Sequence, residues 1–137
     1  MDIETLHHIS LRVTDLERSM RFYAEVLGLT PIERPPFKFP GAWFSLGNRE
    51  LHLIGDVSHQ SNRPRSIDTG DTHFAIRVRS FARAMEELRG LGYREEADGD
   101  DPRCMVVRPN SIVGYPQAYI LDPDRYLIEI NAERLDA

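Results

Sequence analysis

The sequence has one cysteine, Cys104, among its 137 residues, so an internal disulfide bond is excluded. It has no apolar run of the roughly 20 residues that a membrane helix needs, and no basic-then-apolar start of the signal-peptide kind. Basic residues are outnumbered, and the formal net charge of −5 argues against nucleic acid as a partner, because phosphate binding needs a clustered positive surface. We therefore expect an acidic cytoplasmic protein with no membrane partner.

The chain contains an internal repeat. The segment HISLRVTDLERSM (8–20) aligns without a gap on HFAIRVRSFARAM (73–85). The repeat predicts two modules, at about 5–57 and 70–134. Neither module is large enough to bury a good core alone, so we expect both to share one domain over residues 1–137.

The later parts of the two modules also correspond. The stretches AWFSLGNRELHLI (42–54) and AYILDPDRYLIEI (118–130) each predict a strand, a tight polar turn and a second strand. A further short strand is expected at CMVV (104–107). Loops are predicted where proline, glycine and polar residues concentrate: 31–41, 56–70 and 97–103.

Each module also predicts one helix. Asp15 is a good N-cap for a helix that continues to residue 27, and Gly28 stops it. Ser80 similarly precedes an amphipathic stretch that continues to residue 91, and Gly92 stops that helix.

Two adjacent histidines open the first strand, and alternation of side chains assigns them to opposite faces. His7 shares its parity with the apolar residues Ile9, Leu11 and Val13, so it packs or frays at the strand edge. His8 lies on the opposite, polar face. The same alternation in three later strands gives a dense apolar face and a second face with polar residues. The four polar faces carry His8, His52, His73 and Glu129.

If the strands form a shared cup, the second faces line it, and three imidazoles with one carboxylate suit a divalent transition metal. A single histidine in a strand is usually only a tolerated polar residue, but four residues of the right parity at repeat-equivalent positions favour ligation. Arg12 and Arg77 are interpreted as strand-end charges whose heads reach solvent. His59 lies in a polar loop and is expected to be solvated.

The sequence resembles the vicinal oxygen chelate superfamily, which includes glyoxalase I, the bleomycin-resistance proteins and extradiol dioxygenases. The motifs that carry the resemblance are HHISLRVTDLERSMRFYAEVLGL, ELHLI, THFAIRVRSF and ILDPDRYLIEIN. The resemblance implies an α+β fold in which two βαβββ modules form a cup-shaped, mostly antiparallel sheet around one metal ion. By resemblance His8, His73 and Glu129 match metal ligands, and His52 occupies the place of a glutamate in glyoxalase I.

The resemblance further implies a metal-dependent lyase, isomerase or epimerase that acts on a small oxygenated substrate. One divalent metal ion (zinc, nickel, cobalt, manganese or iron) would act as a Lewis acid and stabilise a negative oxygen when a proton leaves the adjacent carbon. Either Glu129 or Glu50 is the expected base. Glu50 shares the face of His52, and its alternative interpretation is an exposed turn residue.

Other activities in the superfamily remain as alternatives. Glyoxalase I uses metal-bound glutamates in both modules, and only Glu129 is present here, which argues against lactoylglutathione lyase activity. Fosfomycin thiol transferases resemble the segment GAWFSLGNRELHLIGD, but RPNSIVGYPQ lacks their serine- and lysine-bearing potassium loop. An extradiol dioxygenase needs open metal positions, one of which His52 would fill. A metal-free drug-binding protein of the bleomycin-resistance type has no need of four intact ligand positions.

A small-molecule pocket is expected beside the predicted metal site. Apolar walls would come from Phe37, Phe39 and Trp43, and a few polar groups would fix the substrate. The residues predicted to bind substrate are Trp43, Arg108, Asn110 and Tyr115. Candidates for an anionic substrate group are Arg63, Arg65 and Arg108. We also expect a homodimer, because a curved sheet leaves edges to cover.

Overall fold

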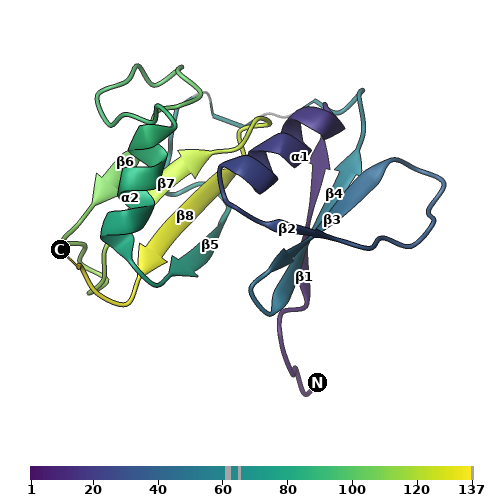
Figure 1. Ribbon diagram of the computed structural model, residues 1–137, viewed down its shortest axis with the longest axis horizontal. Helices are drawn as coiled ribbons and strands as arrows, with labels where there is room; N and C mark the ends of the chain where they lie inside the picture. Colours follow the sequence, from purple (N-terminus) through teal and green to yellow (C-terminus); the bar gives the residue numbers. More distant parts are fainter. Residues whose placement is uncertain (61–62, 65, 137) are drawn as a thin grey trace. The chain divides into compact units, whose positions relative to one another are not determined.

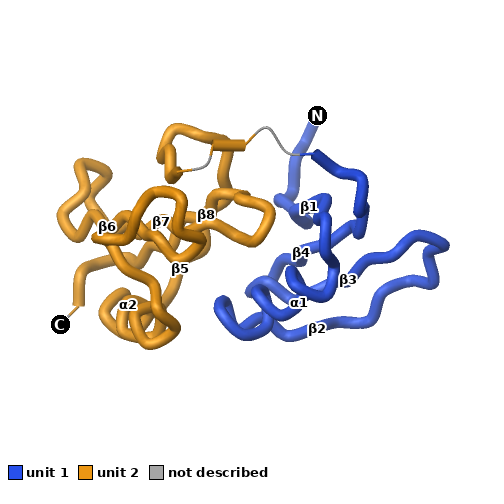
Figure 2. Tube along the Cα trace, turned by 90° about the horizontal axis from the view of Figure 1, so that it is seen from above, with its two compact units in different colours: residues 1–61 blue, residues 62–137 orange. Residues whose placement is uncertain are grey.

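The computed structural model describes residues 1–60, 63–64 and 66–136 (Figure 1). Contacts within the chain divide it into two units, residues 1–61 and 62–137, which are blue and orange in Figure 2. Among its described residues each unit has one helix and four strands, in the order strand, helix, strand, strand, strand. The predicted α+β class with two βαβββ modules is therefore confirmed.

Unit one is an open four-stranded sheet with one helix. Its strand order is β1-β4-β3-β2, in which β1 pairs parallel with β4 and the other two pairings are antiparallel. The elements are β1 (His8–Val13), α1 (Leu16–Glu25), β2 (Thr30–Ile32), β3 (Gly41–Leu46) and β4 (Arg49–Gly55).

Unit two repeats this topology strand for strand. Its order is β5-β8-β7-β6, with β5 parallel to β8 and the other two pairings antiparallel. The elements are β5 (His73–Val78), α2 (Phe81–Gly90), β6 (Val106–Arg108), β7 (Gln117–Leu121) and β8 (Leu127–Ala132). The repeat in the sequence thus corresponds to a repeat of topology and register.

Both helices begin at the predicted caps. The side chains of Asp15 and Ser80 each accept a hydrogen bond from the backbone N–H three residues further on, at 3.0 and 3.1 Å. Past the helix ends, Gly28 and Gly92 have positive φ angles of 67° and 96°, which glycine adopts without steric cost. The helices end one or two residues earlier than predicted, within the usual variation of helix ends.

Two strand predictions need correction. The segment 31–41 is predicted as a loop, but Pro31 and Ile32 belong to β2. A strand at the edge of a sheet tolerates proline, since its missing N–H is not needed on the open side. The strand predicted at 104–107 begins later, as β6 (Val106–Arg108), and Cys104 makes only an isolated bridge with Arg94.

In each unit the helix lies over one face of the sheet (Figure 1), and in unit two a further buried apolar cluster, Cys104, Tyr119, Leu121 and Leu127, lies apart from the helix. In unit one Leu11, Val13, Leu51 and Leu53 are buried, and the Tyr23 ring of α1 lies 6.4 Å from that of Phe44. In unit two, buried apolar residues of α2 and of the last two strands include Phe81, Met85, Leu88, Ile120, Ile128 and Ile130. Each such side chain contributes about 1.5–3 kcal/mol of hydrophobic stabilisation. The predicted apolar faces of the strands are therefore confirmed.

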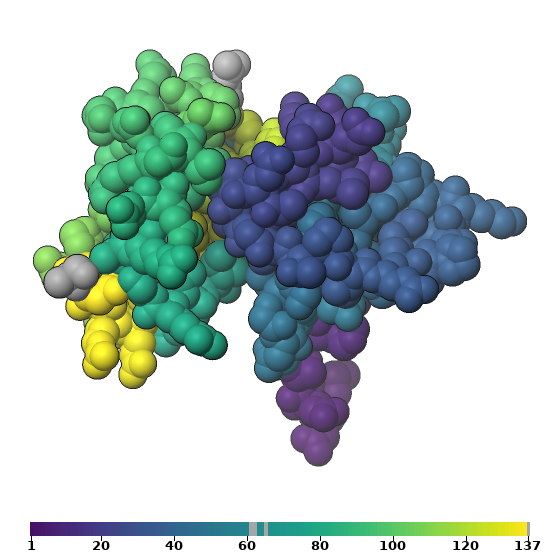
Figure 3. All heavy atoms as spheres, viewed as in Figure 1, coloured from purple at the N-terminus to yellow at the C-terminus, as the bar shows by residue number. Residues whose placement is uncertain are grey.

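The exposed N-terminal segment of the chain adds little to this core. Residues 1–7 precede β1 and are exposed, and they form the purple segment at the bottom of Figure 3. In the described part of the chain, neither helix is long and apolar enough to span a bilayer.

Candidate metal centre

Unit one places four of the predicted site residues on the polar face of its sheet. The parallel pairing sets His8 of β1 beside Glu50 of β4 and Ser10 beside His52, and Trp43 of β3 lies opposite His52. The His52 ring is stacked between two others, with its centroid 3.8 Å from the Trp43 ring and 4.2 Å from the His8 ring. Its Nε2 lies 2.9 Å from a carboxylate oxygen of Glu50.

This stacking bears directly on whether His52 ligates a metal. The planes of the His8 and His52 rings differ by only 18°. Lone pairs on ring nitrogens lie in the ring plane, so nearly parallel rings do not direct them at a common point. His52 would have to rotate away from Glu50 and Trp43 to share an ion with His8. In the arrangement observed, Glu50 and Trp43 fix His52.

His7 lies just before β1 and is exposed, so its side chain does not join the apolar face, although its backbone oxygen still accepts from the N–H of Glu50 at 3.3 Å. Its Nδ1 is 2.9 Å from Nδ1 of His8, and one of these two nitrogens must carry the proton of that hydrogen bond. When His8 is the donor and its ring is neutral, its Nε2 has the lone pair that a metal requires.

In unit two, Glu129 of β8 is held by amide groups on both sides. Gln117 Nε2 and Asn131 Nδ2 each donate to Oε1 of Glu129 at 2.9 Å, and the carboxylate is only 6% exposed. The second oxygen, Oε2, lies 3.3 Å from Nε2 of His73. One carboxylate oxygen is thus fully engaged, and the other faces a predicted metal ligand.

The surroundings of Glu129 favour its charged form. Burial alone would raise the pKa of Glu129, but hydrogen bonds from Asn131, Gln117 and His73 outweigh it and lower the pKa below its usual value. Glu129 therefore stays ionised, as a metal-binding carboxylate must, and its low pKa makes it a weak base.

The second nitrogen of His73 fixes the state of its ring. Nδ1 lies 2.8 Å from the backbone oxygen of Asp71, and a carbonyl can only accept, so Nδ1 carries a proton. In the neutral ring Nε2 then has a lone pair that faces the Glu129 carboxylate. Two acceptors at this distance repel unless a proton or a cation lies between them. A histidine bonded to a carbonyl through its outer nitrogen is typical of metal sites.

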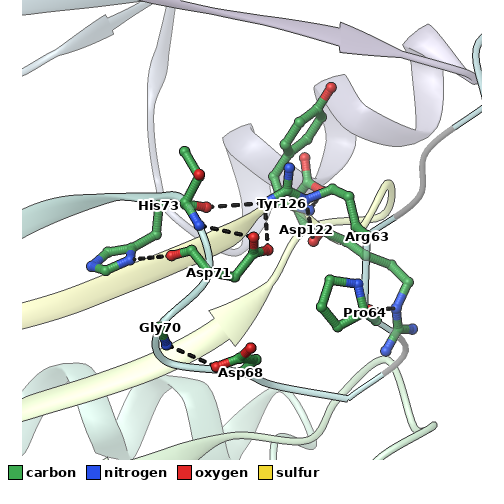
Figure 4. A network of polar contacts seen from close by, with 10 residues as sticks. Arg63, Pro64, Asp68, Gly70, Asp71, His73, Asp122 and Tyr126 are labelled. Atoms are coloured by element: carbon green, nitrogen blue, oxygen red, sulfur yellow. Dashed lines mark hydrogen bonds and ion pairs between the residues drawn. The ribbon is translucent and has the colours of Figure 1, made fainter.

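A network behind His73 holds the start of β5 in place (Figure 4). Arg63 donates to the carboxylate of Asp71 at 2.7 Å and to the backbone oxygen of Thr72 at 2.9 Å, and its guanidinium lies 4.7 Å from the centre of the Tyr126 ring. Arg63, predicted as a candidate for substrate binding, is therefore engaged with protein groups. Arg65, the other such candidate from this loop, lies outside the described residues.

An outer layer of polar groups orients the two amides, and sequence reasoning missed it. Ser111 donates to Oε1 of Gln117 at 2.6 Å, and Arg77 donates through Nε to Oδ1 of Asn131 at 2.9 Å. Each amide accepts from outside and donates to Glu129. Asn131 shares the parity of Glu129 in the sequence, which was the one available signal for this role.

The other three residues predicted to bind substrate, Arg108, Asn110 and Tyr115, belong to unit two. Arg108 donates to the hydroxyl of Thr69 at 3.1 Å, and its guanidinium lies 5.7 Å from the centre of the Tyr119 ring. Tyr115 is half-buried, and Asn110 is exposed in the turn after β6. A separate hollow of about 220 Å³ lies beside α2, and none of the residues that line it is a predicted site residue.

Each unit therefore carries part of the predicted ligand set. Unit one supplies His8 and His52, and unit two supplies His73 and Glu129. Within the described ranges, no three histidine, cysteine, aspartate or glutamate side chains are grouped so as to hold a metal ion.

Comparisons with known proteins agree with the motif analysis. A sequence model described as the glyoxalase/bleomycin resistance protein/dioxygenase superfamily matches residues 5–130. The glutathione transferase FosA of Serratia marcescens is 31% identical over 135 residues, which cover 98% of this chain and 85% of that protein. A lactoylglutathione lyase of Escherichia coli O157:H7 is 29% identical, over 94% of this chain and 93% of that one.

A solved structure shows the same fold. It is a glutamate-to-glutamine mutant of the genomically encoded fosfomycin resistance protein FosX from Listeria monocytogenes, complexed with Mn(II) and 1S,2S-dihydroxypropylphosphonic acid. The two chains are 21% identical and superpose with a TM-score of 0.70, over 96% of this chain and 93% of that one.

Proposed function

Since the chain belongs to the glyoxalase/bleomycin resistance protein/dioxygenase superfamily, we propose that it is an enzyme that acts on a small oxygenated substrate with one divalent metal ion. The proposed ligands are His8, His73 and Glu129, with His52 as a fourth once it leaves Glu50. The two partial ligand sets would then bind a single ion.

The observation that carries this proposal is the contact between His73 and Glu129. Their facing atoms, Nε2 and Oε2, are 3.3 Å apart, and the outer atoms of both groups are engaged by other partners. When the His73 ring is neutral, Nε2 and Oε2 each have a lone pair available to a shared cation. A nitrogen and a carboxylate oxygen suit zinc, nickel, cobalt, manganese or iron. Mn(II) is bound by the FosX mutant, whose fold this chain shares.

The chemistry that a bound metal supplies is Lewis-acid stabilisation of a negative oxygen on the substrate. Glu129 stays ionised although it is buried, and the hydrogen bonds from the two amides keep its carboxylate from rotating. Glu50 is the better placed base, because its side chain is 31% exposed and, among the described residues, its one recorded partner is the ring of His52. The proposed reaction class is abstraction of a proton next to a substrate carbonyl. Trp43 would form a wall of the pocket.

Thiol transfer is the second candidate function, and the similarity to FosA over nearly the whole chain favours it. A panel of two assays separates the candidates. Solvent deuterium exchange into 2-oxo and 2-hydroxycarbonyl compounds reports proton abstraction, and consumption of glutathione in the presence of fosfomycin reports thiol transfer. No turnover in either assay, together with absence of metal, would favour a drug-binding protein.

Metal content is the direct test of the proposed site. Protein purified without chelators should contain one divalent ion per chain by elemental analysis, and His73→Ala should lose it. His59→Ala is the matched control, because His59 lies in a loop outside both partial ligand sets. Equal metal content in wild type and His73→Ala would refute the assignment.

Trp43 offers a second readout. It is the only tryptophan, and its ring stacks on His52. If His52 joins the metal, titration with the ion should change the fluorescence of Trp43, and the change should disappear in His52→Ala.

We further propose a cytoplasmic homodimer, which light scattering at micromolar concentration would distinguish from a 15.8 kDa monomer.

A further inference from the structure

Two arginines at equivalent positions of the repeat have different surroundings. Arg12 pairs in register with Ile54, and its Nη1 lies 3.7 Å from the carboxylate of Asp56. Arg77 pairs in register with Asn131 and donates to the side-chain oxygen of that residue at 2.9 Å. The sequence predicts that both arginines are strand-end charges that reach solvent, and both are exposed, but Arg77 is in addition hydrogen-bonded to a residue of the neighbouring strand.

The charge of Arg77 is not neutralised within the described part of the chain. Its recorded partners there are the Asn131 amide oxygen and the ring of Tyr115, whose centre is 4.8 Å from the guanidinium carbon. Neither partner carries a negative charge. The hydrogen bond uses Nε, so the two terminal nitrogens have no recorded partner among described residues. The guanidinium is thus held in orientation, and the four N–H donors of its two terminal nitrogens are available.

The register of unit two places this guanidinium close to the candidate metal ligand. A row across the sheet consists of Arg77, Asn131, Gln117 and Arg108, one from each strand. Glu129 lies in the adjacent row of the same face. The amide of Asn131 joins the two, since it accepts from Arg77 and donates to Glu129 at 2.9 Å. One side chain therefore separates an unneutralised cation from the predicted metal site.

We propose that Arg77 is an anion-binding subsite that receives a carboxylate, phosphonate or phosphate group of the substrate. The two terminal nitrogens of a guanidinium match two oxygens of such a group. This proposal deepens the proposed function and rests on it: the substrate class becomes a small anionic compound whose charged group lies a few bonds from the oxygens that the metal would bind. Arg77 also orients Asn131 through their hydrogen bond. That contact alone is compatible with a purely structural role for Arg77, so the experiments must separate the two roles.

The first experiment needs neither a metal nor a known substrate. Chelator-treated full-length protein, labelled with nitrogen-15, is titrated with inorganic phosphate at constant ionic strength, and the arginine Nε–H signals are followed by NMR. The Arg77 signal should shift saturably, and sodium chloride over the same range should not reproduce the shift. An Arg77 signal that does not respond to phosphate would overturn the proposal.

Variants separate binding from structural support. Arg77→Gln should weaken phosphate binding by about tenfold or more, because the variant loses the hydrogen bonds between a charged guanidinium and the phosphate. Arg77→Lys, which keeps the charge but not the fork, should lose less. Arg12→Gln is the matched control from unit one, and its affinity should equal that of wild type. Equal affinity in Arg77→Gln and wild type would assign Arg77 to support of Asn131 alone.

Metal content of the same samples keeps the two proposals distinct. Wild-type protein that binds metal but shows no phosphate response at Arg77 would refute the subsite and leave the metal centre intact. Protein that binds phosphate at Arg77 but never binds metal would refute the proposed function and leave an anion site without its catalytic neighbour.

Discussion

Replacement of Gln117 by glutamate tests the arrangement around Glu129. Gln117 donates to Glu129 across 2.9 Å, and both side chains are 6% exposed. In Gln117→Glu two buried carboxyl groups meet at this distance, and both cannot remain ionised, so the folded state must hold one extra proton. An unfolded glutamate has a pKa of about 4.3, so taking up that proton at pH 7 costs about 3.7 kcal/mol. Part of this cost returns as the hydrogen bond between the two carboxyls, and we expect destabilisation by about 2–4 kcal/mol.

The pH dependence of this loss follows from the direction of the two pKa shifts. In the variant one folded-state pKa is raised, so the cost is present at neutral pH and shrinks by about 1.4 kcal/mol per unit as pH falls toward the unfolded value. In wild type the pKa of Glu129 is lowered, so its stabilisation is present above the unfolded pKa and is lost as pH falls through the folded value. Both effects reduce the difference in unfolding free energy between the variant and wild type as the pH falls.

Urea unfolding of chelator-treated protein at about pH 7 and about pH 4.5 measures the difference in unfolding free energy. Gln60→Glu is the matched control, because Gln60 is the only other glutamine and is exposed, and a surface change of this kind stays within about 0.5 kcal/mol. A loss for Gln117→Glu that is below about 1 kcal/mol at neutral pH, or that is equal at both pH values, would refute the description of Glu129 as a buried, amide-bound carboxylate.

Two further predictions concern other parts of unit two. Asp71→Asn removes the partly buried ion pair with Arg63 and loosens the carbonyl that fixes His73, so zinc affinity measured by chelator competition should fall by about tenfold; unchanged affinity would show that the network is not needed to orient the ligand. Cys104 is buried, and burial raises the pKa of its thiol, so Ellman's reagent should react far more slowly with native protein than with protein in urea. Equal rates would contradict the packing described here.

Local rules allowed much of this fold to be predicted. The N-caps Asp15 and Ser80 were identifiable because a short polar side chain directly precedes an amphipathic stretch. Strand faces followed from strict alternation, and His8 and His73 were placed correctly on the polar faces. The strand β2 (Thr30–Ile32) was missed, because it is short, contains proline and exists only by pairing with a distant partner, β3.

Some residues of the candidate site could likewise be predicted from the local sequence pattern, and others depend on contacts between distant strands. The strand positions of Glu129 and His52, on the second faces of their sheets, followed from parity and from the repeat. The roles of Gln117 and Arg77 depend on which residues lie opposite Asn131 in neighbouring strands, and one sequence does not specify that register. Arg63 was a candidate for binding an anionic substrate group because it lies in a loop, whereas its ion pair with Asp71, eight residues further on, holds it in place.

The two units have different surroundings at one pair of equivalent positions in their sheets. His52 and Glu129 occupy the same register position, beside Ser10 and Ala75 respectively. In unit two the surroundings preserve one charge state and one orientation, because two amides hold the carboxylate. In unit one the corresponding ring is held by stacking and by one carboxylate, contacts that a rotation about the side chain can exchange. If the proposed metal centre is correct, one copy of the repeat supplies a fixed anionic ligand and the other supplies a ring that can enter or leave the coordination of the ion. Variation among related chains should then concentrate in the surroundings of His52 rather than in those of Glu129.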